Sequence, residues 1–157
     1  MTPRAGKIDI AVLISGRGSN LQSLIDACAR DDFPARISVV LSNKADAYGL
    51  VRAQTAGIPT HVISHKDFAD RESFERAMLE CLSAHPVDLI CQAGFMRILT
   101  STFISPWRGR LINIHPSLLP KFKGLHTHER AIEAGEAEAG CTIHFVNEGV
   151  DEGEIIL

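Results

Sequence analysis

The chain has 157 residues, of which 45% are hydrophobic and 22% charged, and its formal net charge at pH 7 is −3. This length and composition are typical of a single globular domain, whose hydrophobic core can stabilise it without disulfides or a structural metal. The slightly acidic balance argues against wholesale binding to nucleic acids or anionic membranes, which depends on an excess of Lys and Arg. No apolar run approaches the ~18 residues of a membrane span and no secretory cleavage site follows residues 8–14, so we expect a cytoplasmic protein.

The cysteine pattern also indicates a cytoplasmic protein. They are far apart in the sequence, lie among apolar residues and form no C-x-x-C pair: Cys28, Cys81, Cys91 and Cys141. This pattern predicts reduced, buried thiols, with neither disulfides nor zinc ligation. Cys91 lies inside an apolar run, which is typical of an unreactive thiol.

Strands and helices alternate along residues 8–93. Apolar, β-rich runs predict strands at residues 8–14, 37–41, 58–63 and 87–93. Apolar residues spaced by three and four predict helices starting at Ser19, over residues 47–56, and from an Asp70 cap to just before Pro86. Ser19 and Gln22 have the spacing of a capping box, which predicts Ser19 as an N-cap. Such alternation indicates right-handed βαβ units, and so an α/β fold with a mostly parallel sheet and helices on both faces.

The alternation becomes less regular from Gly94 onward. We expect a short helix near Thr102, a strand at residues 111–114, a Pro-rich loop over residues 116–124 and a helix over about residues 127–135. Two further strands are expected at residues 141–146 and 154–157. Loops at the strand ends of an open sheet are where ligands bind, so the site is expected there.

A glycine-rich turn joins the first strand to the first helix. Gly16, Gly18, Ser19 and Asn20 can present backbone N–H groups at a helix N-terminus, where a phosphate is favoured. A purely geometric role for the glycines is the alternative. Leu21 replaces the third glycine of a dinucleotide motif, and a Walker lysine is absent. The motif therefore indicates a single phosphate, as on a ribonucleotide.

The segment N-I-H-P-S-L-L-P places two polar side chains at a strand end. Asn113 and His115 share one face because strand side chains alternate. An amide that donates to an oxyanion, beside an imidazole that moves a proton near neutral pH, suits acyl transfer, although a lone N-x-H pattern is more often structural. Asp151 opens the last expected strand and is a candidate carboxylate partner for His115, with a distance that the sequence cannot give.

Other polar residues have simpler explanations. The spacing of His115, His126, His128 and His144 matches no usual ligand set, so no metal site is predicted. His61, His65 and His85 lie at element ends and are expected to be solvated. Ser15 and Ser117 lack a nucleophile elbow. Arg71, in the first turn of a helix, is either an exposed side chain or an arm for an anionic ligand.

Six motifs occur in order: S-G-R-G-S-N-L-Q, S-N-K-A-D-A-Y-G-L, G-F-M-R-I-L, N-I-H-P-S-L-L-P, G-L-H-T-H and V-D-E-G-E-I-I. With them the chain resembles the phosphoribosylglycinamide formyltransferases, a folate-dependent family, from Lys7 to Leu157. The resemblance implies a Rossmann-like formyltransferase fold and transfer of a formyl group from 10-formyltetrahydrofolate to the amine of glycinamide ribonucleotide, in purine biosynthesis. It implies small-molecule substrates, with 10-formyltetrahydrofolate as co-substrate and no tightly bound cofactor or metal.

The resemblance also assigns residues. It implies that Gly18, Ser19 and Asn20 bind the ribonucleotide phosphate and that Asn113, His115 and Asp151 form the catalytic set. The folate-binding residues it implies are Arg71, Met96, Arg97, Ile98, Leu99 and Asn113. Asp151 would favour the imidazolium form of His115.

The sequence departs from the family in two places. Lys123 stands where proline is frequent, and the chain ends at Leu157, so we expect a single formyltransferase domain over residues 1–157 that lacks the family's C-terminal strand and helix. Two alternatives to a transferase stay open: a 10-formyltetrahydrofolate hydrolase, and a non-catalytic module that binds folate or a ribonucleotide. The oligomeric state is not predicted.

Overall fold

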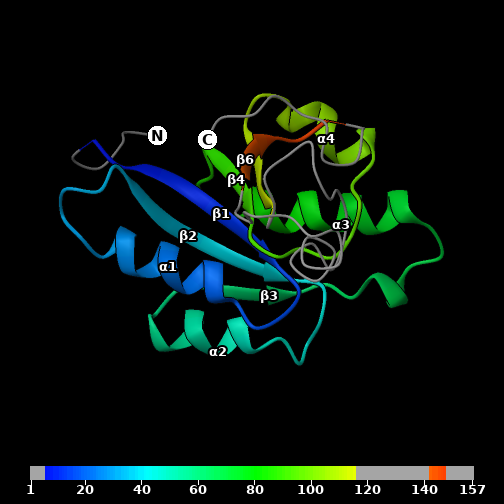
Figure 1. Cartoon of the computed structure of the whole chain (residues 1–157). Coiled ribbons are helices and arrows are strands. Elements are labelled where there is room, and N and C mark those ends of the chain that lie inside the picture. Colours follow the sequence, from blue (N-terminus) through cyan, green and yellow to red (C-terminus); the bar gives the residue numbers. More distant parts are fainter. Residues whose placement is uncertain (1–5, 116–141, 148–157) are drawn as a thin grey trace, which may run out of the picture.

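The computed structural model describes residues 6–115 and 142–147 (Figure 1). The strands are β1 Ile8–Ile14, β2 Ala35–Ser42, β3 Thr60–Val62, β4 Leu89–Gln92, β5 Leu111–His115 and β6 Thr142–Phe145. The helices are α1 Ser19–Cys28, α2 Tyr48–Thr55, the 3-10 turn η1 His65–Asp67, α3 Arg71–Ser83 and α4 Ser101–Trp107. The helix expected near residues 127–135, the strand at residues 154–157 and the loop at residues 116–124 lie outside the described residues.

The six strands form one sheet in the order β3-β2-β1-β4-β5-β6. Neighbouring strands from β3 to β5 are parallel, and β6 pairs antiparallel with β5. The expected α/β class and mostly parallel sheet are therefore confirmed.

Both faces of the sheet are covered by helices, because strand β1 sends alternate side chains to opposite sides. Ala11 and Leu13 belong to a core cluster that includes residues of α3 and α4. Ile10, Val12 and Ile14 belong to a second cluster that includes residues of α1 and α2. Figure 1 shows α1 and α2 on the side of the sheet away from α3.

Several boundaries differ from those expected. Strand β3 begins at Thr60, two residues late, because Ile58 donates its N–H to Ala53 O at the end of α2 and Pro59 has no N–H. Strand β4 begins at Leu89. The capping-box prediction is wrong: the N-cap of α1 is Gly18, in the left-handed conformation, and Ser19 is the first helical residue. The Asp70 cap is confirmed, since its carboxylate accepts from Ser73 N at 2.7 Å.

The strand order reverses beside β1. From β1 the chain moves outward through β2 and β3, then returns to place β4 on the other side of β1. At such a switch point the connections that follow the two central strands diverge and leave a crevice outside their carboxyl ends. The glycine-rich turn, residues 15–18, follows β1, and residues 93–100 follow β4. Both are therefore at the edge of the sheet where a ligand is expected.

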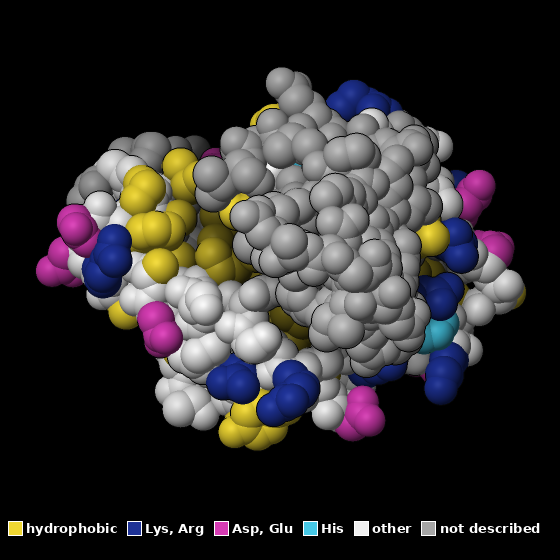
Figure 2. All heavy atoms as spheres, viewed as in Figure 1, with side chains coloured by type: hydrophobic (Ala, Val, Ile, Leu, Met, Phe, Trp, Pro, Cys, Tyr) yellow, Lys and Arg dark blue, Asp and Glu magenta, His cyan; other side chains and the backbone are white. Residues whose placement is uncertain are grey.

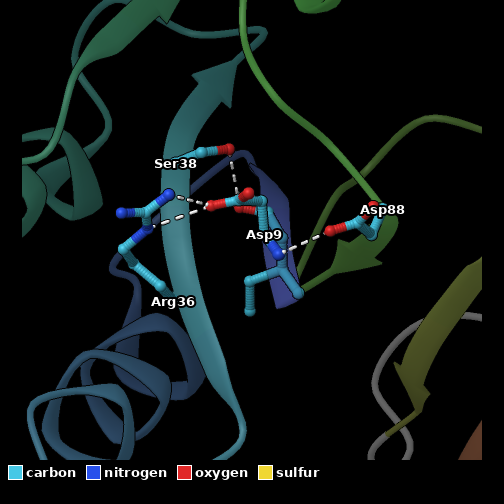
Figure 3. A network of polar contacts seen from close by, with 5 residues as sticks. Asp9, Arg36, Ser38 and Asp88 are labelled. Carbon is cyan, nitrogen blue, oxygen red and sulfur yellow. Dashed lines mark hydrogen bonds and ion pairs between the residues drawn. The ribbon is translucent and has the colours of Figure 1, made fainter. Parts of the chain in front are cut away.

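A polar network closes the opposite end of β1 (Figure 3). The Asp9 carboxylate is 2% exposed and accepts from Arg36 Nε at 3.0 Å and from Arg36 Nη2. The Asp9 backbone N–H donates to Asp88 Oδ2 at 2.8 Å, and Ser38 Oγ donates to Ile10 O. These contacts join β1, β2 and the start of β4 at the amino ends of the strands, so their role is structural.

We expect Asp9→Ala to lower the free energy of unfolding by about 2 kcal/mol, because it leaves the half-buried Arg36 guanidinium without its carboxylate. Urea denaturation measures the change. Asp32→Ala is the matched control, since the Arg30–Asp32 pair is 64% and 81% exposed and such pairs contribute less than ~1 kcal/mol. Equal losses in the two variants would contradict the structural role of Asp9.

In the described part of the chain, no helix is both long and apolar enough to span a membrane.

Candidate active site

The glycine-rich turn is held against helix α2. Gly18 has φ +77°, and a Cβ built on it would lie 2.7 Å from Gly49 Cα, so only glycine allows this close approach. Gly49 N donates to Gly16 O at 3.0 Å, and Arg52 Nε donates to Arg17 O at 2.8 Å. Two carbonyl groups of the turn are thus bound from the α2 side, which fixes the path of the turn.

The start of α1 offers N–H groups to a ligand. The first N–H groups of any α-helix have no intrahelical partner, and the N-cap here, Gly18, has no side chain to accept from them. Ser19 and Asn20 occupy the first two helical positions. This geometry agrees with the expected phosphate site, because the N–H groups and the helix dipole favour an anion at this end.

Residues 96–99 follow β4 and are held at their first residue by Ser15. Met96 N donates to Ser15 Oγ at 2.7 Å, and Ser15 Oγ donates to Asn43 Oδ1 at 2.5 Å. Ser15 and Asn43 are 3% and 2% exposed. One buried hydroxyl thus joins the ends of β1 and β2 to the segment that follows β4. This role of Ser15 was not predicted from the sequence, where the residue stood out only as a serine without a nucleophile elbow.

The other end of the segment is held by Glu75 on α3. This carboxylate is fully buried and accepts from Thr100 N at 2.9 Å, Thr100 Oγ1 at 2.7 Å and Phe103 N at 3.0 Å. Glu75 therefore caps the start of α4 from another helix. A signal for it exists in the sequence, since Glu75 precedes Met78 and Leu82 by three and seven residues and so lies on their apolar helix face.

Arg71 lies one turn before Glu75 on the same helix. It is the first residue of α3 and its side chain is exposed. Residues four apart share a helix face, so Arg71 lies on the face through which Glu75 contacts Thr100. Helix α3 therefore carries both Arg71 and the carboxylate that binds Thr100, the residue that follows the 96–99 segment.

Asn113 on β5 lies opposite His144 on the antiparallel strand β6. Asn113 Nδ2 lies 3.3 Å from His144 Nε2, and His144 Nδ1 lies 2.8 Å from Phe145 O. A carbonyl oxygen only accepts hydrogen bonds, so His144 Nδ1 carries a hydrogen and donates it to Phe145 O. His144 Nε2 then carries no hydrogen and accepts one from the Asn113 amide. An amide nitrogen has two hydrogens, so Asn113 can donate the second one to a ligand oxygen. This contact of His144 was not predicted from the sequence, which raised the residue only as one of four histidines without a metal-ligand spacing.

The backbone of His115 lies in β5, two residues beyond Asn113 and paired with Thr142. The His115 side chain, Asp151, His126 and His128 lie outside the described part of the structure. That Asn113 and His115 share one face therefore stays a prediction from the alternation of strand side chains. The pairing of His115 with Asp151 also stays a prediction.

The three histidines expected to be solvated are half-buried and have partners, so that expectation is wrong. His61 Nε2 lies 2.9 Å from His85 Nε2, and His65 Nδ1 lies 3.4 Å from Asn43 Nδ2. The end of β3 and the C-terminal end of α3 bring the first pair together, which local sequence does not reveal.

His65 lies at a basic edge of the molecule. Partial burial, followed by the charges of Arg97, Lys66 and Lys44, lowers the pKa of His65 below its usual value of 6.5. Segments 43–46 and 64–66 line an open pocket of about 270 Å³ beside it. Figure 2 shows several Lys and Arg side chains along the lower and right-hand edges of this face of the molecule.

The described residues support neither a reactive Cys91 thiol nor a metal site. Burial raises the pKa of the Cys91 thiol to about 12, so this thiol is unreactive as expected. Within residues 6–115 and 142–147, no group of three or more His, Cys, Asp and Glu side chains could hold a metal ion.

Comparison with known proteins agrees with this geometry. Residues 8–157 match the family model described as formyl transferase. The chain is 56% identical over 148 residues to a phosphoribosylglycinamide formyltransferase of Haemophilus influenzae, covering 94% of this chain and 70% of that protein. It is 60% identical over 151 residues to the trifunctional purine biosynthetic protein adenosine-3 of Drosophila melanogaster, covering 94% of this chain and only 11% of that protein.

A solved structure has the same fold. A phosphoribosylglycinamide formyltransferase from Brucella melitensis superposes with a TM-score of 0.91 at 51% identity, covering 96% of this chain and 78% of that one. The family model spans every element described above, from β1 to β6, and the six motifs that suggested the family lie within it. The family predicted from the motifs is confirmed: the chain belongs to the formyl transferase family.

Proposed function

We propose that this chain transfers a formyl group from 10-formyltetrahydrofolate to the amine of glycinamide ribonucleotide, as a step of purine biosynthesis. The observation that carries the proposal is the arrangement at the switch point. An N–H-rich helix start follows β1, an apolar segment follows β4, and Ser15 Oγ connects the two. A phosphate-bearing substrate and a ring-bearing co-substrate would thus be held side by side. The names of the relatives support the choice of this reaction among formyl transfers.

The substrate roles follow from this arrangement. The N–H groups at Gly18, Ser19 and Asn20 bind the ribonucleotide phosphate, where the helix dipole favours negative charge. The apolar side chains and backbone of Met96, Arg97, Ile98 and Leu99 hold the pterin ring of the folate. Arg71 is exposed, and its guanidinium binds the carboxylate of the folate tail. Neither substrate requires a tightly bound cofactor or a metal ion.

The reaction proceeds by attack of the ribonucleotide amine on the formyl carbon. A new C–N bond forms and the formyl oxygen becomes an oxyanion, which accepts hydrogen bonds from the Asn113 amide and from protonated His115. The bond between the formyl carbon and N10 of the folate then breaks. The proton lost by the attacking amine is transferred to N10, which leaves as an amine. Asp151 favours the imidazolium form of His115 and helps to move that proton.

We further propose that the reaction takes place in the cytoplasm. Among the described residues, Cys28, Cys81 and Cys91 are all free thiols, as a reducing compartment maintains them.

The proposal is tested by following 10-formyltetrahydrofolate with and without glycinamide ribonucleotide. We expect loss of the formyl group only when the ribonucleotide is present, with one formylated ribonucleotide produced for each folate consumed. Formate that accumulates without ribonucleotide would identify a hydrolase. Binding of both compounds without turnover would identify a non-catalytic module. Either result would overturn the proposal.

We expect Asp151→Asn to lower the pKa of the His115 imidazole, because a neighbouring carboxylate stabilises the cation. An NMR titration of His115 in both proteins measures the change. Activity that depends on the imidazolium should then be lost at a lower pH in the variant, since the cation disappears as the pH rises through the pKa. The same titration of His61 serves as an internal control. If Asp151 only begins the last strand, the variant is less stable but the His115 titration is unchanged.

A further inference from the structure

Residues 96–99 lie between two hydrogen-bonded attachments to buried side chains, Ser15 at Met96 and Glu75 at Thr100, the residue that follows the segment. At the first end, the backbone N–H of Met96 donates to Ser15 Oγ, whose own hydrogen goes to Asn43 Oδ1. Because Asn43 orients the hydroxyl hydrogen away from Met96, the oxygen lone pairs of Ser15 are directed to the Met96 N–H. Ser15 and Asn43 therefore act as one unit.

At the second end, the Glu75 carboxylate binds Thr100 by two hydrogen bonds and Phe103 by one. Hydrogen bonds from N–H and O–H groups to an ionised carboxylate are stronger than those between neutral groups. The carboxylate is also at the N-terminus of α4, where the helix favours negative charge. Three donors at one buried carboxylate leave residue 100 little freedom to move.

Between these two attachments, two apolar side chains face solvent and one is buried in the core. Met96 and Ile98 are 50% and 55% exposed, whereas Leu99 is 5% exposed and packs in the core cluster of α3 and α4. Two large apolar side chains are thus held outward on a segment whose ends are fixed. A binding surface fixed in this way loses less conformational entropy when a ligand binds.

We infer that Ser15, oriented by Asn43, and Glu75 are positioning residues that hold residues 96–99 in the conformation that binds the folate. This inference rests on the proposed function and adds to it. Ser15 acts on the backbone of the first residue of the segment, and Glu75 acts on Thr100 and Phe103, which follow the segment. Ser15 also directly precedes Gly16, so it fixes the segment relative to the glycine-rich turn, whereas Glu75 fixes it relative to Arg71 on α3.

The inference is tested with Ser15→Ala and Glu75→Gln. Ser15→Ala removes the acceptor of Met96 N, and Glu75→Gln places an NH₂ group where an oxygen accepts. The controls are Ser83→Ala, an exposed serine at the C-terminal end of α3, and Glu72→Gln, an exposed residue of α3. Calorimetry with 10-formyltetrahydrofolate and, separately, with glycinamide ribonucleotide measures the two affinities in each protein.

We expect the folate Kd to rise at least ~10-fold in each of the two variants, since small misplacements of positioned groups are costly. The ribonucleotide Kd should stay within about twofold of the unchanged chain in Glu75→Gln. The controls should leave both values unchanged. Amide hydrogen exchange adds an independent readout: the Met96 amide should lose protection in Ser15→Ala, and the Thr100 amide in Glu75→Gln. A residue that only stabilises the fold would lower the melting temperature and leave the folate Kd of the folded protein unaltered.

If Glu75→Gln does not fold, Thr100→Val takes its place, with Thr100→Ser as the variant expected to restore binding. Valine has the shape of threonine without the hydroxyl that donates to Glu75, whereas serine keeps the hydroxyl. Unchanged folate affinity in folded Ser15→Ala and in Thr100→Val or Glu75→Gln would overturn the inference while leaving the proposed function intact. If the unchanged chain itself binds no folate, the proposed function fails, and this inference with it.

Discussion

The variant His115→Asn is expected to bind both substrates and to turn over at least ~10²-fold more slowly than the unchanged chain, because it loses a proton carrier and a charge directed at the oxyanion. The backbone of residue 115 lies on β5, two positions beyond Asn113, whose amide we assign to the oxyanion. Asparagine can still donate a hydrogen bond from this position, but it cannot exchange a proton near neutral pH.

Single-turnover measurements with both substrates saturating separate this loss from weakened binding. His85→Asn is the control, since His85 is a half-buried histidine that contacts His61 on the edge strand β3, away from β5. The control should lose stability but retain the rate of the chemical step. A near-normal rate in folded His115→Asn would exclude the catalytic role.

The second large effect is expected at Gly18. In Gly18→Ala the new Cβ would lie 2.7 Å from Gly49 Cα, and alanine is also strained at φ +77°. The turn must move away from α2, and the N–H groups at the start of α1 move with it. We expect the affinity for glycinamide ribonucleotide to fall at least ~10-fold, since its phosphate depends on the placement of those groups.

Gly57→Ala separates the effect of backbone strain from the effect of the close contact with Gly49. Gly57 has almost the same φ, +75°, but a Cβ built there has nothing within 4 Å, and the residue follows the far end of α2. Both variants should lose roughly 1–3 kcal/mol of stability from backbone strain. Only Gly18→Ala should lose ribonucleotide affinity, and calorimetry on both proteins decides it. Equal affinities would show that the glycines of the turn serve backbone geometry alone.

Much of the fold could be predicted from local sequence, because its causes act over a few residues. The alternation along β1 determines which residues face each layer of helices, and the apolar spacing in α3 determines its buried face. The Asp70 cap is equally local, since the carboxylate reaches an N–H only three residues away. The Ser19 cap was predicted by the same rule and is wrong, because the contact of Gly18 with Gly49 from α2 decides the conformation there.

The candidate site likewise has features that local sequence predicts and contacts that it does not predict. The sequence by itself determined the residue types at each strand end: glycines after β1, an apolar segment after β4, and Asn113 with His115 at the end of β5. Only the tertiary structure decided which of these meet, because contacts between strand ends depend on the order and direction of the strands. Ser15 reaches Met96 across 81 residues because β4 lies beside β1, and Asn113 reaches His144 across 31 because β6 runs antiparallel to β5. Glu75 meets Thr100 across 25 because α3 and α4 share one face of the sheet.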